Sequence, residues 1–204
     1  KFNVSGAISF DDPLDTRVRQ GFRYKWRFIP DDHNYSELTG SIIPYPSEED
    51  RKPRLSLNNY SKEFDGKTID IKDIKYTAKV NGSSIDGTLR WKNGAPIYVR
   101  DSGYVRVVFR PDNSRYDEVE DSLKVSIYKK RIVGTPEFTK IYSSDKTLHD
   151  VNLNKGSIKD SGYIKFRLPL DTKVIYGQSY EWEFEPSDKD NYETKSGSIV
   201  PYGE

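Results

Sequence analysis

The sequence contains no cysteine and no methionine, and it has two histidines, His33 and His149. Without cysteine there are no disulfides, thiol nucleophiles, cysteine-based zinc sites or iron–sulfur clusters. Each histidine sits in a polar stretch with no partner motif, so a Ser–His–Asp arrangement is not indicated. No apolar run approaches the roughly 20 residues that a membrane-spanning helix needs. The sequence therefore predicts no catalytic residues, no cofactor and no membrane insertion, and we interpret the chain as non-enzymatic.

Charge of one sign is also lacking, because 33 Lys and Arg residues face 32 Asp and Glu residues. A net charge of +1 does not favour nucleic acid as a partner. Hydrophobic residues reach only 34% of the chain, whereas 13% are aromatic and 15 are tyrosines. A core must therefore rely on large amphipathic rings packed in thin layers.

An internal repeat organises the chain. Residues 5–45 match residues 161–202 at 22 of 41 positions, with one residue inserted in the second copy. A more diverged copy lies between them and keeps the order Gly, apolar, aromatic, Gly, Phe-x-Pro, Tyr. We predict three parts: the trailing half of a repeat at 1–46, a complete diverged repeat at 47–131, and a complete repeat at 132–204. We call them the N-terminal, middle and C-terminal repeats, and we interpret the proline-flanked polar stretch 46–53 as a connector.

Hydrophobic periodicity is two throughout the repeats. Residues 22–28 alternate aromatic and basic side chains, and residues 180–185 alternate aromatic and acidic ones. This period places all rings on one face of a strand and all charges on the other. Further strands are predicted at 69–80, 87–91, 104–110, 123–129, 163–168 and 197–202, and no segment shows a helical stripe with caps. The fold class is therefore all-β, with each repeat a β-sandwich.

The rings at equivalent repeat positions are the predicted structural core. In each Phe-x-Pro segment the Phe ends a strand, and the proline breaks the ladder because it has no N–H to donate. The Tyr that follows is expected to bury its ring and bond its hydroxyl to nearby backbone. The predicted core residues are Trp26, Phe28, Tyr35, Trp91, Phe109, Tyr116, Trp182, Phe184 and Tyr192. A sugar-stacking role for the three tryptophans is the alternative.

The pattern Gly-x-x-Tyr-x-Trp-x-Phe-x-Pro, followed by Asn-Tyr and then Gly-Ser-Ile, occurs at 21–42 and 177–199. It resembles tandem immunoglobulin-like repeats of bacterial cell-surface proteins, of the adhesin and S-layer type. The resemblance implies immunoglobulin-like β-sandwich units in a row, in a secreted protein of the cell wall or S-layer. It implies a stalk or adhesive role, and the motif marks scaffold rather than activity.

Charge differs between the repeats, whose net charges are 0, +4 and −3 in chain order. The exterior of one strand bears Arg23, Lys25 and Arg27. The corresponding strand of the C-terminal repeat bears Glu181, Glu183 and Glu185. We consider two interpretations: weak self-association through these faces, or ordinary charges that keep strand exteriors soluble.

Two further hypotheses concern ligands. The acidic turn of the C-terminal repeat offers Asp188, Asp190, Asn191 and Glu193 as weak calcium candidates, although a solvated turn rich in Asp and Asn needs no metal. The alternative to a stalk is a carbohydrate- or protein-binding module, which would contact a cell-surface glycan or protein through exposed rings. The candidates for such contacts are Tyr98, Tyr104 and Tyr176.

Overall fold

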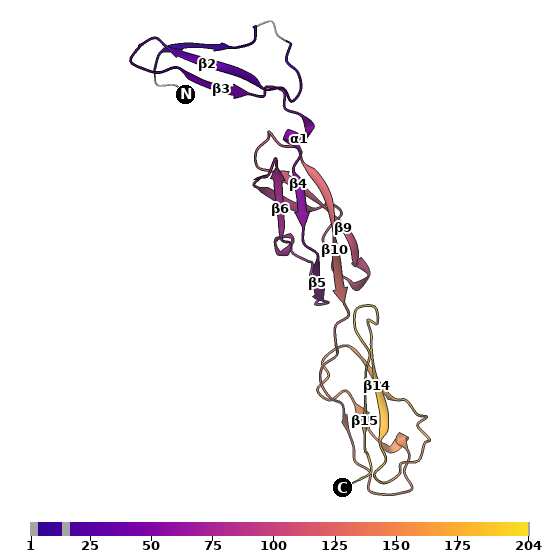
Figure 1. The fold of residues 1–204 in the computed structure, drawn as a ribbon. Helices are drawn as coiled ribbons and strands as arrows, with labels where there is room; N and C mark the ends of the chain where they lie inside the picture. The colour runs from indigo at the N-terminus through magenta and orange to yellow at the C-terminus, as the bar shows by residue number, and fades with distance from the viewer. Residues whose placement is uncertain (1–3, 14–16, 204) are drawn as a thin grey trace. The chain divides into compact units, whose positions relative to one another are not determined.

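The computed structural model describes residues 4–13 and 17–203, and its regular secondary structure is mainly β-strand (Figure 1). The described strands pair in the orders β1-β2-β3, β4-β6-β7, β5-β10-β9-β8, β11-β12 and β13-β14-β15. The all-β class is thereby confirmed. Within the described ranges, no helix is long and apolar enough to cross a membrane.

The strands and short helical segments have the following bounds. The strands are β1 (Gly6–Phe10), β2 (Tyr24–Pro30), β3 (Leu38–Ile42), β4 (Arg54–Leu57), β5 (Tyr60–Glu63), β6 (Tyr76–Val80), β7 (Ser83–Ser84), β8 (Gly87–Trp91), β9 (Gly103–Pro111), β10 (Val119–Tyr128), β11 (Glu137–Phe138), β12 (Leu153–Asn154), β13 (Gly162–Phe166), β14 (Tyr180–Pro186) and β15 (Lys195–Ile199). The short helical segments are α1 (Glu48–Arg51), η1 (Ile71–Asp73), η2 (Val99–Asp101) and η3 (Leu148–Asp150).

The chain divides into two compact units. Unit 1 comprises Lys1–Asn58, Ile74–Asn93 and Arg106–Ser122. Unit 2 comprises Asn59–Asp73, Gly94–Val105 and Leu123–Glu204. The division passes through β9 and β10, so residues of the middle repeat belong to both units.

In unit 1, the antiparallel sheet β1-β2-β3 carries the alternating pattern predicted for residues 22–28. Along β2, Tyr24 and Phe28 are buried while Lys25 and Arg27 are exposed. The neighbouring strands place apolar side chains on the ring-bearing face, because Phe10 lies opposite Trp26 and Ile42 lies opposite Tyr24. The period of two thus produces one apolar and one charged face.

The connector in unit 1 contains a short helix that the sequence analysis missed. Ser47 and Asp50 form a capping box around α1: the Ser47 hydroxyl accepts from the Asp50 N–H, and the Asp50 carboxylate accepts from the Ser47 N–H. The Asp50 carboxylate also accepts a hydrogen bond of 2.8 Å from Asn81 Nδ2. The Ser-x-x-Asp spacing was the available signal, but four residues are too few to show a hydrophobic stripe.

Elsewhere in unit 1, β6 packs against β9. The ring centroids of Tyr76 and Phe109 lie 5.6 Å apart, and the Tyr76 hydroxyl donates to the Gly87 carbonyl at 2.9 Å. Phe109 and Val107 are both fully buried. Two sheets therefore share an apolar layer at this point.

In unit 2, the sheet β13-β14-β15 is covered by the segment 132–158. The shared core contains Phe166, Tyr180, Trp182, Phe184 and Ile199 from the sheet side, with Ile132, Ile141, Leu148, Val151 and Ile158 from the segment. Fully burying one such side chain contributes about 1.5–3 kcal/mol. Burial of this core is therefore the main stabilising contribution that the C-terminal repeat shows.

Buried tyrosines fix the entry to the ring-bearing strands, at a different position from the predicted one. The Tyr180 hydroxyl accepts from the Ile175 N–H and donates to the Lys173 carbonyl, both at 2.9 Å. In unit 1, Tyr24 is 5% exposed and makes the equivalent bonds with Arg19 and Arg17. The hydroxyl anchor thus belongs to the first ring of the strand.

The predicted anchors Tyr35, Tyr116 and Tyr192 differ from this arrangement. Tyr35 is 55% exposed, so the structure does not place it in a core. Tyr116 and Tyr192 are half-buried. A tyrosine after the turn is buried only where other chain segments cover it, and the sequence of the turn does not reveal whether they do.

Glycines of the repeat motif provide room for rings on the adjacent strand. A Cβ atom added at Gly197 would lie 2.7 Å from the Trp182 ring, and one added at Gly40 would lie 2.4 Å from the Trp26 ring. At Gly87 an added Cβ would lie 2.6 Å from the Phe109 ring. The recurrence of glycine with Trp or Phe in the repeat is therefore explained by packing.

Strand predictions agree best where alternation is regular. Residues 87–91 form β8 as predicted, and the strands predicted at 104–110 and 163–168 correspond to β9 and β13 within a few residues. The single strand predicted at 69–80 is wrong in its first half, where η1 precedes β6. The Asp70 carboxylate accepts from the Lys72 N–H at 3.0 Å, and this local bond favours a turn over a ladder.

The packing of Gly197 against Trp182 predicts that Gly197→Ala destabilises the C-terminal repeat by roughly 1–3 kcal/mol, the usual cost of overpacking. Urea unfolding of the full chain, followed by tryptophan fluorescence, measures this change. Gly203→Ala is the matched control, because its added Cβ would have ordinary contact distances. Equal midpoints for the two variants would contradict the packing explanation.

Candidate functional site

A junction within unit 2 brings together residues from the middle and C-terminal repeats. It consists of the turn 187–193, the connecting residues 129–131, the loop 97–101 and Phe64. We call this set the unit 2 junction. The turn contains the calcium candidates, and its contacts with the loop were not predicted from the sequence.

Asn191 is the polar centre of the unit 2 junction. Its side chain is 4% exposed, and its Oδ1 accepts a hydrogen bond of 2.9 Å from the Val99 N–H. Its Nδ2 donates to the Asp188 carboxylate, with a shortest distance of 2.9 Å. Burying a side-chain amide costs free energy unless its oxygen and its nitrogen both have hydrogen-bond partners. Both atoms of Asn191 have such partners.

The loop that Asn191 contacts is itself fixed by a carboxylate. Asp101 Oδ2 accepts from the N–H groups of Ile97 and Tyr98, both at 2.9 Å. These two backbone bonds lower the pKa of Asp101 below its ordinary value. Val99 follows directly, so Asp101 satisfies two successive N–H groups and Asn191 satisfies the third.

Aromatic rings fill the apolar side of the unit 2 junction. The Phe64 ring contacts Tyr192 edge-on, with centroids 5.6 Å apart, and it stacks on Tyr98 at 6.1 Å. Phe64 is 6% exposed, and the Arg100 guanidinium lies over the Tyr98 ring at 4.4 Å. Ring pairs of this kind contribute about 0.5–1.5 kcal/mol beyond the area they bury.

Lys130 ties the connecting residues to the turn through its backbone and its side chain. Its N–H donates to the Asn191 carbonyl at 2.8 Å, and its carbonyl accepts from the Glu193 N–H at 2.9 Å. Its Nζ lies 2.9 Å from an Asp160 carboxylate oxygen. This hydrogen bond raises the pKa of Lys130 above its ordinary value. Residues 129–131 are therefore attached to the turn by a short parallel β-bridge between Lys130 and Tyr192.

Unit 1 contains the same backbone bond at the repeat-equivalent place. There the Asp117 N–H donates to the Arg51 carbonyl at 2.9 Å, as the Glu193 N–H does to Lys130. An Arg51–Asp117 ion pair of 3.5 Å accompanies it. The segment before the middle repeat and the segment before the C-terminal repeat are thus attached to the turn after Phe-x-Pro by the same kind of backbone hydrogen bond.

Three of the four calcium candidates have partners within the protein. Asp188 uses its carboxylate to accept from Asn191, and Asn191 is committed to Val99 and Asp188. Glu193 lies 3.9 Å from Arg131. Across residues 4–13 and 17–203, no group of three or more His, Asp or Glu residues could hold a metal ion. The Asp188 carboxylate accepts from the Asn191 N–H three residues on, and this bond helps to hold the turn.

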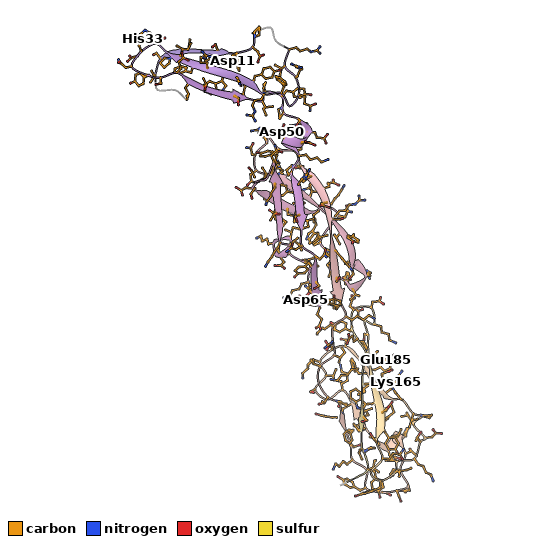
Figure 2. The ribbon with its side chains drawn as sticks, viewed as in Figure 1. Asp11, His33, Asp50, Asp65, Lys165 and Glu185 are labelled. Carbon is orange, nitrogen blue, oxygen red and sulfur yellow. The ribbon has the colours of Figure 1, made fainter. Side chains whose placement is uncertain are left out.

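The acidic strand β14 pairs with basic side chains of β13 and of the segments next to the sheet, and Figure 2 labels one such pair, Glu185 and Lys165. Arg167 of the neighbouring segment pairs with Glu181 at 3.2 Å and with Glu183 at 3.1 Å. Glu185 accepts from Lys165, Lys189 and Tyr163. Lys165 contributes most, followed by Lys189 and Tyr163, and together they lower the pKa of Glu185 from 4.5 to about 2.

Basic side chains of β2 in unit 1 also have partners within their own sheet or next to it. Arg27 lies 3.6 Å from Glu37, and Arg23 donates to the Ser41 hydroxyl at 2.9 Å. The repeat register pairs Lys25 with Glu181 and Arg27 with Glu183, whereas Glu185 corresponds to Ile29 and Arg23 to Ser179. The inversion of charge therefore covers two positions rather than the three compared in the sequence analysis.

The change of charge sign between the two repeats also occurs in the segment next to each strand, at Asp11 and Arg167. The Asp11 N–H donates to the Lys25 carbonyl at 3.1 Å, and the Arg167 N–H donates to the Glu181 carbonyl at 3.1 Å. Asp11 and Arg167 are repeat equivalents, so both members of this neighbouring pair change sign together. This swap favours charge compensation inside each sheet over attraction between sheets.

The proposed ring contacts differ in exposure. Tyr98 belongs to the unit 2 junction, whereas Tyr104 is 78% exposed and Tyr176 is 58% exposed. Trp182 is buried, and Trp26 and Trp91 are half-buried within their sheets. The rings of Tyr104 and Tyr176 are thus accessible to a partner.

Comparison of the chain with protein-family models and with curated proteins finds no match. The similarity to immunoglobulin-like surface repeats therefore remains a prediction from the motif.

The contacts of Glu185 predict a pH dependence of stability. Because the folded state lowers this pKa, the unfolded state binds the proton more tightly, and stability falls as pH drops from about 4.5 to about 2. Glu185→Gln should flatten this part of the stability curve, measured by urea unfolding at several pH values. Glu181→Gln, at a more exposed member of the strand, should leave the slope near that of the parent chain.

Equal slopes for Glu185→Gln and the parent chain between these pH values would contradict the assignment.

Proposed function

We propose that the chain is a non-catalytic, structural repeat region of an exported bacterial surface protein. In this proposal, immunoglobulin-like β-sandwich units follow one another as a stalk or adhesive segment. Its role would be to project other parts of the protein away from the cell surface, outside the cell. Three features support the proposal: the internal duplication, the all-β architecture, and the structural use of the motif residues.

The observation that carries the proposal is the Asn191–Val99 hydrogen bond in the unit 2 junction. A flexible tether between repeats would leave the turn and the loop solvated. Instead, a buried amide, a ring cluster and the β-bridge at Lys130 connect them. A stalk needs its successive units to resist bending, and such contacts supply that resistance.

The motif residues support the same conclusion. The glycines accommodate rings, the first tyrosine of β2 and of β14 anchors the strand, and the turn that begins at Asp188 presents Asn191 to Val99. The packing and hydrogen bonds of the fold thus account for these residues without a ligand. The recurring part of the sequence thus specifies a building unit, and a ligand would be recognised by residues outside it.

A binding function through exposed rings is the second candidate. The observation that favours it is the exposure of Tyr104 and Tyr176, which carry large apolar surfaces into solvent. Tyrosine is common at binding surfaces. Both rings lie outside the unit 2 junction, so binding there is compatible with a structural role for the repeats.

The test removes the amide of the unit 2 junction. Asn191→Ala leaves the Val99 N–H without its partner, at a cost of about 1–3 kcal/mol for a buried donor. By ¹⁵N relaxation, amides 97–105 and 187–199 should share one rotational correlation time in the parent chain and should tumble differently in the variant.

Asn34→Ala is the matched control. Asn34 is the repeat equivalent of Asn191, and it also bonds a preceding aspartate, Asp32, through its N–H and Nδ2. It is exposed, so its loss should change neither stability nor tumbling by a comparable amount. Independent tumbling of the two segments already in the parent chain would contradict the stalk proposal.

A further inference from the structure

On the ring-bearing face of the sheet β1-β2-β3, Tyr24 and Phe28 of the central strand are buried, but the flanking strands leave apolar side chains exposed in the part of the chain that the structure describes. Several apolar side chains on or beside this sheet are exposed, from 41% for Phe10 and Ile42 to 59% for Ile8. Soluble proteins rarely leave a contiguous apolar face of a sheet open to water without a partner for it.

The C-terminal repeat shows what covers the equivalent face. Its sheet β13-β14-β15 has the same register, because Ile164 and Phe166 lie opposite Phe184 and Trp182 as Ile8 and Phe10 lie opposite Phe28 and Trp26. The segment 132–158 packs on that face.

Matched residues therefore differ in exposure according to this cover. Phe10 is 41% exposed and Phe166 is 8% exposed; Val18 is 49% exposed and Val174 is 2% exposed. Ile42 is 41% exposed, whereas its equivalent Ile199 is 8% exposed. The side chains are identical in each pair, and those of the C-terminal repeat share a core with the segment 132–158.

The face of the N-terminal repeat is already shaped to receive such a segment. Tyr24 makes the same two hydroxyl bonds as Tyr180, and the Gly21 N–H donates to the Tyr45 carbonyl as the Gly177 N–H does to Tyr202. A binding surface whose backbone and anchors are fixed beforehand loses less entropy when it is covered.

We propose that this face is a docking site for the leading half of a repeat, a polypeptide segment with the chemistry of residues 130–160. Its occupant would place aliphatic side chains at the positions of Ile141, Leu148 and Val151. In the C-terminal repeat, backbone hydrogen bonds also join the covering segment to the sheet side. The Ile141 N–H donates to the Pro201 carbonyl, and the Val174 N–H donates to the Lys146 carbonyl.

The repeat partners of those sheet-side residues are Pro44 and Val18, so the same backbone groups exist in unit 1. The occupant thus completes a two-layered unit with a shared core. This inference concerns an interaction surface and does not depend on the stalk role.

The experiment supplies the occupant in cis. A chimera carries a second copy of residues 130–160 directly before Ser5, so that the copied Asp160 precedes Ser5 as Asp160 precedes Ser161. In a control chimera, the copied segment carries Leu148→Asp and Val151→Asp. Hydrogen–deuterium exchange of residues 6–10 and 38–42 is compared in the parent chain and both chimeras, with residues 195–199 as internal standard.

The proposal expects exchange at 6–10 and 38–42 to slow by roughly tenfold or more in the chimera, and to stay at the parent rate in the control. Equal exchange in both chimeras would overturn it. Sedimentation of the parent chain gives the other decisive outcome. A dimer whose residues 6–10 are already protected would identify a second copy of the chain as the occupant and overturn the proposal.

Discussion

Burial of an alternating ring strand against a second polypeptide layer is the interaction on which this structure depends. One face of β14 carries Tyr180, Trp182 and Phe184, and all three are buried beneath the segment 132–158. The opposite face carries charges that pair along the sheet. Because a strand has a period of two, the core and the charged exterior follow from one short stretch of sequence.

The duplication shows how far the sequence alone determines the local structure. The strands β2 and β14 have the same length, register and hydroxyl anchors, although their exterior charges differ in sign. Alternation and turn residues predicted these strands and the all-β class. The packing of glycine against a ring was not predicted, although the recurrence of Gly197 with Trp182 and of Gly40 with Trp26 was the signal for it.

The contacts of the unit 2 junction and the charge pairs of the strand exteriors could be found only from the structure. Whether a tyrosine after the turn is buried depends on distant segments, as the contrast between exposed Tyr35 and half-buried Tyr192 shows. Asn191 looked like a metal ligand by residue type, but its partner Val99 lies 92 positions away and donates through its backbone. A backbone donor carries no side-chain signature, so periodicity and motif spacing could not indicate it.

The central claim is that matched apolar side chains of the two sheets, such as half-buried Trp26 and buried Trp182, differ in exposure because the described residues include a covering segment for the sheet β13-β14-β15 but none for β1-β2-β3. Acrylamide quenching of two single-tryptophan chains tests this claim directly. Trp91→Phe with Trp26→Phe leaves Trp182, and Trp91→Phe with Trp182→Phe leaves Trp26. The account predicts that Trp26 is quenched several-fold more strongly than Trp182, which is 5% exposed. Equal quenching of the two tryptophans would contradict it.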